Sequence, residues 1–139
     1  MFSNTATPED QQYIIAIGAS AGGLQEINAF FDHTPIDGVS YVIIQHLSAD
    51  YKSIMASLLS NHSKLKVCEA QDNTEVEKNK VYVIPSTDYM TIKNGRLLLT
   101  EKQKTGTPHL TINTFFNLTF RSENIYNIRI IRSGFNRHA

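Results

Sequence analysis

Residues 13–23, YIIAIGASAGG, decide the fold that this sequence predicts. The stretch opens on an apolar run that ends at Ile17 and has the length of a buried strand. Glycines and alanines follow, which allow a sharp turn, and Leu24 then begins a segment whose apolar residues recur at helical spacing. A strand, a tight turn and a helix in this order are typical of a parallel α/β domain, with Ser20 in the turn near the helix N-terminus.

The turn around Ser20 has three interpretations. A dinucleotide-binding loop requires Gly-x-Gly-x-x-Gly, and Ser20 replaces the middle glycine, where the backbone must approach pyrophosphate most closely. A nucleophile turn of the Gly-x-Ser-x-Gly kind fits residues 18–22 directly, in the strand-to-helix context that this motif needs. In the third interpretation the small residues only fill a tight connection. The turn by itself leaves these alternatives open, although the nucleotide motif fits worst.

The next predicted strand favours the catalytic interpretation. Residues 39–45 are rich in β-branched side chains, which indicates a buried strand, and His46 follows directly. In a right-handed βαβ unit, neighbouring parallel strands bring their carboxyl ends to the same edge. We therefore expect Ser20 and His46 to lie close enough for the imidazole to accept the hydroxyl proton. The plainer alternative is a surface histidine in a loop.

Hydrophobic spacing predicts the remaining elements. Apolar residues at helical spacing indicate helices that begin at Leu24, Ile54 and Ile112. Short apolar or β-branched runs indicate further strands at residues 66–70, 81–84 and 126–131. The polar runs are expected to be a disordered leader, a loop and a linker, at residues 1–12, 71–80 and 101–108.

Asn94 and Gly95 stand between two strand-like runs, residues 89–93 and 96–100. Asn-Gly is the strongest short signal for a hairpin with a two-residue loop. The pair predicts an antiparallel ribbon inside an otherwise alternating pattern of strands and helices. We expect this ribbon to extend the parallel sheet.

Composition narrows the classes of partner and ligand. The formal net charge is zero and the 13 basic residues are scattered, so we expect no nucleic-acid partner. No apolar run approaches the ~20 residues that a membrane helix needs, so we expect no membrane insertion. The single cysteine, Cys68, and the absence of a signal peptide point to a soluble cytoplasmic protein. The spacing of histidines and carboxylates predicts no metal site, and we expect no cofactor.

Four motifs in order resemble a known family. They are the stretches IGASAGG, IQHL, VYVIP and INTFF, at residues 17–23, 44–47, 81–85 and 112–116. From about Tyr13 to Gly134 the chain resembles the CheB-type protein-glutamate methylesterase domain of bacterial chemotaxis. The resemblance implies a doubly wound, mostly parallel, Rossmann-like α/β sheet. It also implies a Ser, His, Asp triad, with Ser20 as the nucleophile and His46 as the general base.

The same resemblance implies a substrate and two outcomes for activity. Members hydrolyse γ-glutamyl methyl esters on methyl-accepting chemotaxis receptors, and many deamidate receptor glutamines. Their triad aspartate lies in a Gly-x-Gly-x-Asp-Gly turn, and ungapped alignment puts His138 at its position, where it supplies no negative charge. We therefore expect either an impaired methylesterase or an inactive remnant that binds receptors or other signalling proteins. Asp88 is a candidate substitute, with a solvated turn residue as the alternative.

The carboxyl end departs further from the family. The helices and strand that follow in the family are absent after Ala139, so we expect residues 13–139 to form an incomplete domain. Arg129 and Arg132 fall in a predicted strand that should be covered on both faces, where unpaired charges are unfavourable. This end is therefore interpreted as degraded or truncated. No receiver domain precedes the stretch, so phosphorylation control is not expected unless the chain is a piece of a larger fused signalling protein.

Overall fold

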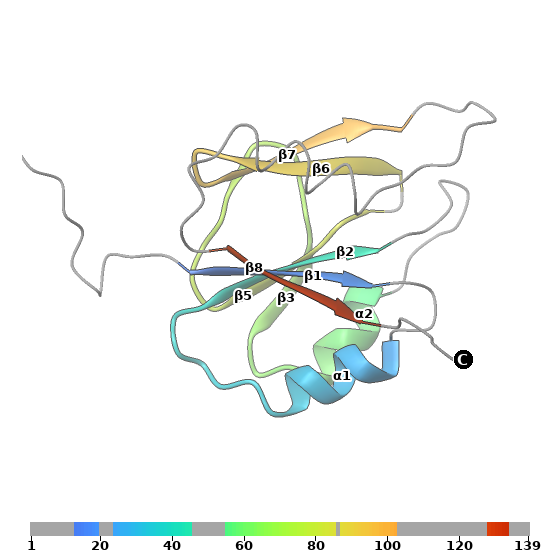
Figure 1. Cartoon of the computed structure of the whole chain (residues 1–139), viewed down its shortest axis with the longest axis vertical. Helices are drawn as coiled ribbons and strands as arrows, with labels where there is room; N and C mark the ends of the chain where they lie inside the picture. Colours follow the sequence, from blue (N-terminus) through green and yellow to red (C-terminus); the bar gives the residue numbers. More distant parts are fainter. Residues whose placement is uncertain (1–12, 20–23, 46–54, 86, 103–127, 134–139) are drawn as a thin grey trace, which may run out of the picture.

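The computed structural model describes residues 13–19, 24–45, 55–85, 87–102 and 128–133. Figure 1 shows three layers, with a five-stranded parallel sheet in the middle. Helices cover one face of this sheet, and a three-stranded antiparallel sheet covers the other. The α/β class and the mostly parallel sheet are confirmed.

The middle sheet has the strand order β3-β5-β2-β1-β8. Its strands, in chain order, are β1 Ile14–Ala19, β2 Ser40–Gln45, β3 Lys66–Glu69, β5 Lys80–Val83 and β8 Ile128–Ser133. The helical segments are α1 Leu24–Asp32, α2 Met55–Leu59 and the 3-10 turn η1 Ser60–His62. No described helix has the length and apolar character needed to span a membrane. The predicted leader and the helix predicted to begin at Ile112 lie outside the described residues.

Alternation along the central strand β2 builds a core on each face of the middle sheet. Tyr41 and Ile43 pack on the helix side, whereas Val42 and Ile44 pack toward the antiparallel sheet. All four side chains are buried. A strand covered on both faces reads as a continuous apolar run, which is why residues 41–44 show no polar alternation.

The helix-side core is centred on three aromatic rings. Phe31 lies 5.0 Å from Phe30 and 5.1 Å from Tyr41 between ring centroids, both in edge-to-face geometry. Phe31 is fully buried, while Phe30 stands at the rim with 37% of its surface exposed. The 3.6-residue period of α1 puts Ile27 and Phe31 on the face toward the sheet. These contacts hold α1 over β2.

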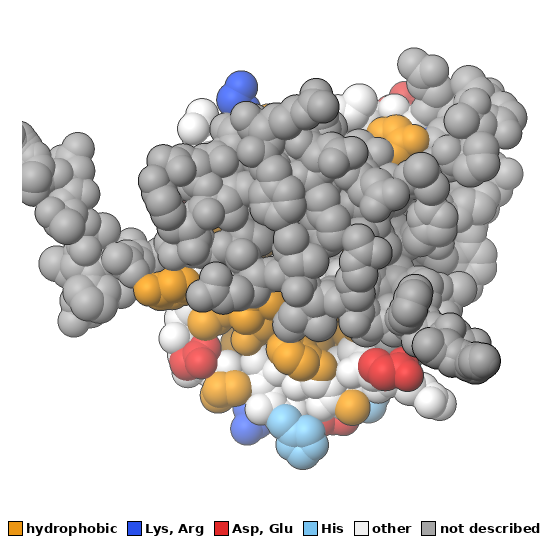
Figure 2. Space-filling model, viewed as in Figure 1, with side chains coloured by type: hydrophobic (Ala, Val, Ile, Leu, Met, Phe, Trp, Pro, Cys, Tyr) orange, Lys and Arg blue, Asp and Glu red, His pale blue; other side chains and the backbone are white. Residues whose placement is uncertain are grey.

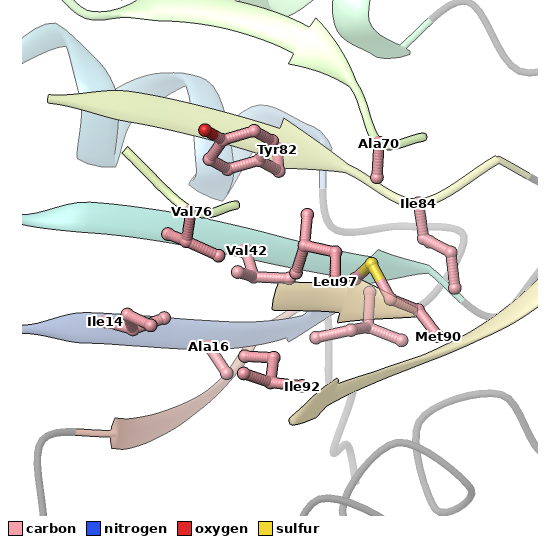
Figure 3. Packing of buried hydrophobic residues seen from close by; sticks show 11 residues of the cluster. Ile14, Ala16, Val42, Ala70, Val76, Tyr82, Ile84, Met90, Ile92 and Leu97 are labelled. Atoms are coloured by element: carbon pink, nitrogen blue, oxygen red, sulfur yellow. The ribbon is translucent and has the colours of Figure 1, made fainter. Parts of the chain in front are cut away.

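The hairpin does not extend the parallel sheet, which corrects our expectation. Its strands β6 Asp88–Lys93 and β7 Arg96–Glu101 join β4 Thr74–Glu75 in a separate sheet of order β4-β7-β6. Figure 3 shows the reason, because apolar side chains of this sheet pack onto the middle sheet. Burying a whole apolar face removes more surface from water than pairing along one edge would.

The prediction of a loop at residues 71–80 is also wrong in part, because this segment contains β4. Thr74 pairs with Leu97, and the N–H of Asn73 donates to the carbonyl of Leu97 at 2.7 Å. Asn73 adopts a φ of 60°, a conformation that asparagine tolerates better than most residues. The strand was not predicted because it has only two residues and lies in a polar run with turn residues at both ends.

The two-residue loop of the hairpin is confirmed at Asn94 and Gly95. Their φ values are 53° and 75°, the left-handed conformation that a type I′ turn requires at both positions. A Cβ added to Gly95 would meet nothing within 4 Å, so a substitution there adds backbone strain without a clash.

We expect Gly95→Ala to lower the free energy of unfolding by about 1 kcal/mol, because a positive φ is unfavourable for alanine. Urea unfolding followed by circular dichroism measures the change. Gly95→Asn is the matched control and should lose less, since asparagine tolerates this conformation. Equal losses in the two variants would contradict an origin in φ.

Candidate active site

The ends of β1 and β2 lie side by side at the carboxyl edge of the parallel sheet. The two strands pair in register from Ile14 with Ser40 to Ala19 with Gln45. Ser20 follows Ala19 and His46 follows Gln45 in the chain, and both lie outside the described residues. The predicted shared edge is confirmed. The pairing of hydroxyl and imidazole stays a prediction.

The strands on either side of this pair, β8 and β5, end at the same edge. Ser133 of β8 pairs with Ala19, on the side of β1 away from β2. Val83 of β5 pairs with Ile43 on the other side of β2. In open α/β sheets, ligands bind outside the carboxyl ends of the strands. This edge is therefore where the fold predicts a site.

Arg129 and Arg132 stand in β8, which has β1 as its partner in the described sheet. The backbone register puts Arg129 beside Ile15 and Arg132 beside Gly18. Both arginine side chains and His138 lie outside what the structure describes. The described part of this strand spans Ile128–Ser133, where we predicted a strand at residues 126–131.

The chain turns sharply after β5 and begins β6 at Asp88. The N–H of Asp88 donates to the carbonyl of Pro85 at 3.3 Å. The Thr87 hydroxyl donates to Asp88 Oδ1 at 2.5 Å. Asp88 is half-buried. The strand before this turn, β5, ends at the same edge as β1 and β2.

Lys102, which follows β7, is a buried cation beside this turn. Only 4% of its surface is exposed, and its N–H donates to the carbonyl of Thr87 at 2.8 Å. Its Nζ lies 5.7 Å from the centre of the Tyr89 ring. Burial lowers the pKa of Lys102, and the nearby Asp88 carboxylate partly offsets this by raising it.

Sequence reasoning missed Lys102, because it falls in the run read as a polar linker, residues 101–108. A lysine among charged and polar residues carries no signal of burial. Among the residues that the structure describes, it is the only charged one that is buried. Buried, desolvated cations are uncommon and concentrate near functional sites.

The described residues away from this edge offer no comparable site. Cys68 in β3 packs against the core, and burial raises the pKa of its thiol, which disfavours the reactive thiolate. Lys80 and Glu77 form an ion pair of 2.8 Å at the surface. In the described ranges no three histidine, cysteine or carboxylate side chains gather as metal ligands would.

Comparison with known proteins identifies a family. The profile of the family described as CheB methylesterase matches residues 15–137. A protein-glutamate methylesterase/protein-glutamine glutaminase of Maricaulis maris is 40% identical over 91 residues, which are 65% of this chain and 22% of the relative. A relative of that name from Xanthomonas campestris pv. campestris is 35% identical over 79 residues, 57% of this chain and 22% of the relative.

A solved structure agrees at the level of the fold. The crystal structure of the Thermotoga maritima CheB methylesterase catalytic domain matches with a TM-score of 0.72 at 22% identity. The match covers 88% of this chain and 67% of that domain. The chain thus spans about a fifth of the length of the curated relatives and two thirds of the solved domain.

Proposed function

The chain belongs to the CheB methylesterase family, and from this premise we propose that it hydrolyses γ-glutamyl methyl esters. We propose methyl-accepting chemotaxis receptors, or related signalling proteins, as its substrates. The relatives' shared name adds the deamidation of protein glutamine as a second reaction of the same site. The observation that carries the proposal is the register of β1 and β2, which ends on the pair Ala19 and Gln45 directly before Ser20 and His46.

Ser20 is the proposed nucleophile and His46 the proposed general base. The imidazole takes the hydroxyl proton while Oγ attacks the ester carbonyl, and a tetrahedral intermediate forms. His46 then gives the proton to the leaving methoxide, and methanol departs from an acyl-enzyme. Water deprotonated by His46 attacks the acyl group and restores the Ser20 hydroxyl. The product is a free glutamate side chain; with glutamine as substrate, ammonia leaves instead.

The start of α1 supports this chemistry electrostatically. The helix begins at Leu24, shortly after Ser20. The first N–H groups of a helix have no partner within it, and they form the positive end of the helix dipole. An oxyanion that develops at this edge gains from such donors, and removing one donor in comparable enzymes costs about 10²- to 10³-fold in kcat.

Covalent trapping and methanol release test the proposal together. A serine-directed fluorophosphonate should add its phosphonyl mass to the wild-type chain and not to Ser20→Ala. A methylated receptor cytoplasmic segment should release methanol with the wild-type chain only. Retention of that segment with neither labelling nor methanol would favour a binding module without catalysis. Equal labelling of both proteins would overturn Ser20 as the nucleophile.

His138→Asp alone should raise the rate of methanol release by less than about tenfold. An orienting carboxylate raises the kcat of a Ser-His pair by a factor of about 10⁴, provided that the carboxylate is held in place. Here Asn136 and Ala139 stand where the family motif has glycines, so the turn lacks the backbone freedom that the motif uses. Initial rates of methanol release measure the effect. A gain near 10⁴ would show that the new carboxylate is already well supported.

A further inference from the structure

Two pairs of lysines that lie apart in the sequence meet at one edge of the middle sheet. Each pair has the pattern Lys-x-Lys. The strands β3 and β5 begin at Lys66 and Lys80, and their parallel register puts these two residues side by side. Lys64 and Lys78 each lie two residues earlier in the chain, at the same amino edge. The pairing of β3 with β5 therefore gathers four positive charges, and we call these four residues the lysine edge.

The lysine edge carries more positive charge than the carboxylates around it balance. Glu77 forms an ion pair with Lys80 at 2.8 Å. A hydrogen bond from Lys80, and then the charges of Lys80 and Lys66, lower the pKa of the Glu77 carboxyl, so this group is ionised at neutral pH. Lys64 and Lys66 are exposed, and no carboxylate of the described residues forms an ion pair with either. Glu69 lies three residues along β3 from Lys66, about 10 Å away, where salt screens most of its charge.

The two strand lysines lie on the same face of the sheet. Side chains alternate along a strand, so Lys66 shares the face of Cys68, and Lys80 shares the face of Tyr82. Cys68 and Tyr82 both pack in the core toward the antiparallel sheet. Like charges side by side on one face repel each other. Glu77, whose N–H donates to the Tyr82 hydroxyl at 2.9 Å, relieves part of this repulsion, and a further carboxylate would relieve more.

β3 is also an edge strand of the described sheet. It comes first in the order β3-β5-β2-β1-β8, with β5 as its partner on one side. The backbone groups along such an edge can pair with a strand from another chain. Lysines on an edge disfavour pairing with basic or purely apolar strands. The same charges favour a strand that carries carboxylates, because opposite charges on paired strands attract each other.

An acidic protein segment fits this edge better than a nucleic acid or a membrane does. Nucleic acids and lipid head groups offer phosphates but no strand backbone that could pair with β3. Figure 2 shows hydrophobic side chains gathered around α1 on one face of the molecule. Among the described residues, the exposed large apolar side chains lie outside β3 and β5, so the lysine edge has no apolar group to enter a membrane; they are Tyr13, Phe30, Ile36 and Leu58.

We propose that the lysine edge and β3 together bind an extended acidic segment of a partner protein, which adds to β3 as a further strand and brings its carboxylates to Lys64 and Lys66. This surface lies at the amino ends of the parallel strands, whereas Ser20 and His46 follow strands that end at the carboxyl edge. The inference therefore goes beyond the proposed hydrolysis and does not depend on it. A partner protein held here leaves the carboxyl edge free.

A labelled peptide tests the proposal on the full chain. The probe is a short fluorescein-labelled peptide of alternating glutamate and valine, and the control peptide has glutamine in place of glutamate. Fluorescence anisotropy measures the Kd of each. We expect the acidic peptide to bind more tightly than the control peptide, and its Kd to rise as salt increases from about 0.05 M to about 0.3 M.

The double variant Lys64→Gln with Lys66→Gln should raise the Kd of the acidic peptide about 2- to 30-fold, because two charge pairs are lost. Both lysines are exposed, so the fold should tolerate the change. Lys93→Gln is the matched control. Lys93 is an exposed lysine at the end of β6, which β7 separates from β4 in the antiparallel sheet. This variant should keep the wild-type Kd.

A peptide of the same sequence with a fully N-methylated backbone tests the added strand separately from charge. It keeps every carboxylate but has no backbone N–H to donate, and we expect it to bind at least about tenfold more weakly. Amide NMR spectra of the full chain locate the acidic peptide. The largest shifts should fall on residues 64–69.

Each measurement has an outcome that overturns the proposal. An unchanged Kd in the double lysine variant, or an equal rise in Lys93→Gln, would show that the lysine edge is not the site. Equal binding of the N-methylated peptide would exclude strand addition. Amide shifts centred on residues 17–19 and 43–45 would place the peptide at the carboxyl edge. Tighter binding of labelled single-stranded DNA or of phosphatidylserine vesicles, lost in the double lysine variant, would assign this edge to another class of partner.

Discussion

Removing Ser20 and His46 together is expected to slow methanol release no further than removing either residue alone. A nucleophile and its base act as one unit, so each is useless without the other. In a complete triad, loss of the nucleophile or of the base lowers kcat by a factor of about 2 × 10⁶. Loss of the aspartate alone lowers kcat by a factor of about 3 × 10⁴. Starting from a chain with an imperfect carboxylate, we expect each single alanine variant to lose at least about 10²-fold.

Initial rates of methanol release from a methylated receptor segment measure these losses. Ser57→Ala is a suitable control, because Ser57 is an exposed serine in α2 on the helix face of the sheet. It should keep the wild-type rate. If the losses of Ser20→Ala and His46→Ala multiplied in the double variant, the two residues would act independently, and the proposed pair would be wrong.

Phe31→Ala is expected to lower the free energy of unfolding by about 3 to 5 kcal/mol. Phe31 is fully buried between α1 and β2, where it makes edge-to-face contacts with Phe30 and Tyr41. Alanine would leave a cavity and remove both aromatic contacts, each worth about 0.5 to 1.5 kcal/mol beyond area burial. Small domains have about 5 to 15 kcal/mol of stability in total, so this one change threatens folding at 37 °C.

Phe30→Ala provides the comparison within the same helix. Phe30 belongs to the same aromatic cluster but is 37% exposed, so its removal opens the rim and creates no closed cavity. We expect a loss of about 1 to 1.5 kcal/mol. The midpoints of urea unfolding, with an unchanged slope, give both values. Similar losses for the two variants would show that burial does not set the contribution of these rings.

Patterns over a few residues predicted the local elements well. The apolar runs of β1, β2 and β5 and the helical spacing of α1 lie within one to three residues of the observed bounds. The shared edge of β1 and β2 also followed, since a short right-handed crossover leaves little choice of neighbour. The roles of Ser20 and His46 at this edge remain predictions.

Longer-range features were not visible in such patterns. Nothing near Asn94 shows whether the hairpin pairs with an edge or packs on a face, and we expected the wrong one. A polar run gave no sign that Lys102 is buried, because its burial depends on the turn at Thr87.

By itself, the sequence determined the βαβ unit around Ser20, the type I′ turn at Asn94 and Gly95, and membership of the family. These depend on backbone preferences and hydrophobic periods that act over a few residues, or on motifs read directly. Only the tertiary structure decided that β5 lies beside β2, that the hairpin covers the sheet, and that Lys102 is buried next to Asp88. Those features depend on which apolar faces meet, and that is settled by the total surface removed from water across the whole domain.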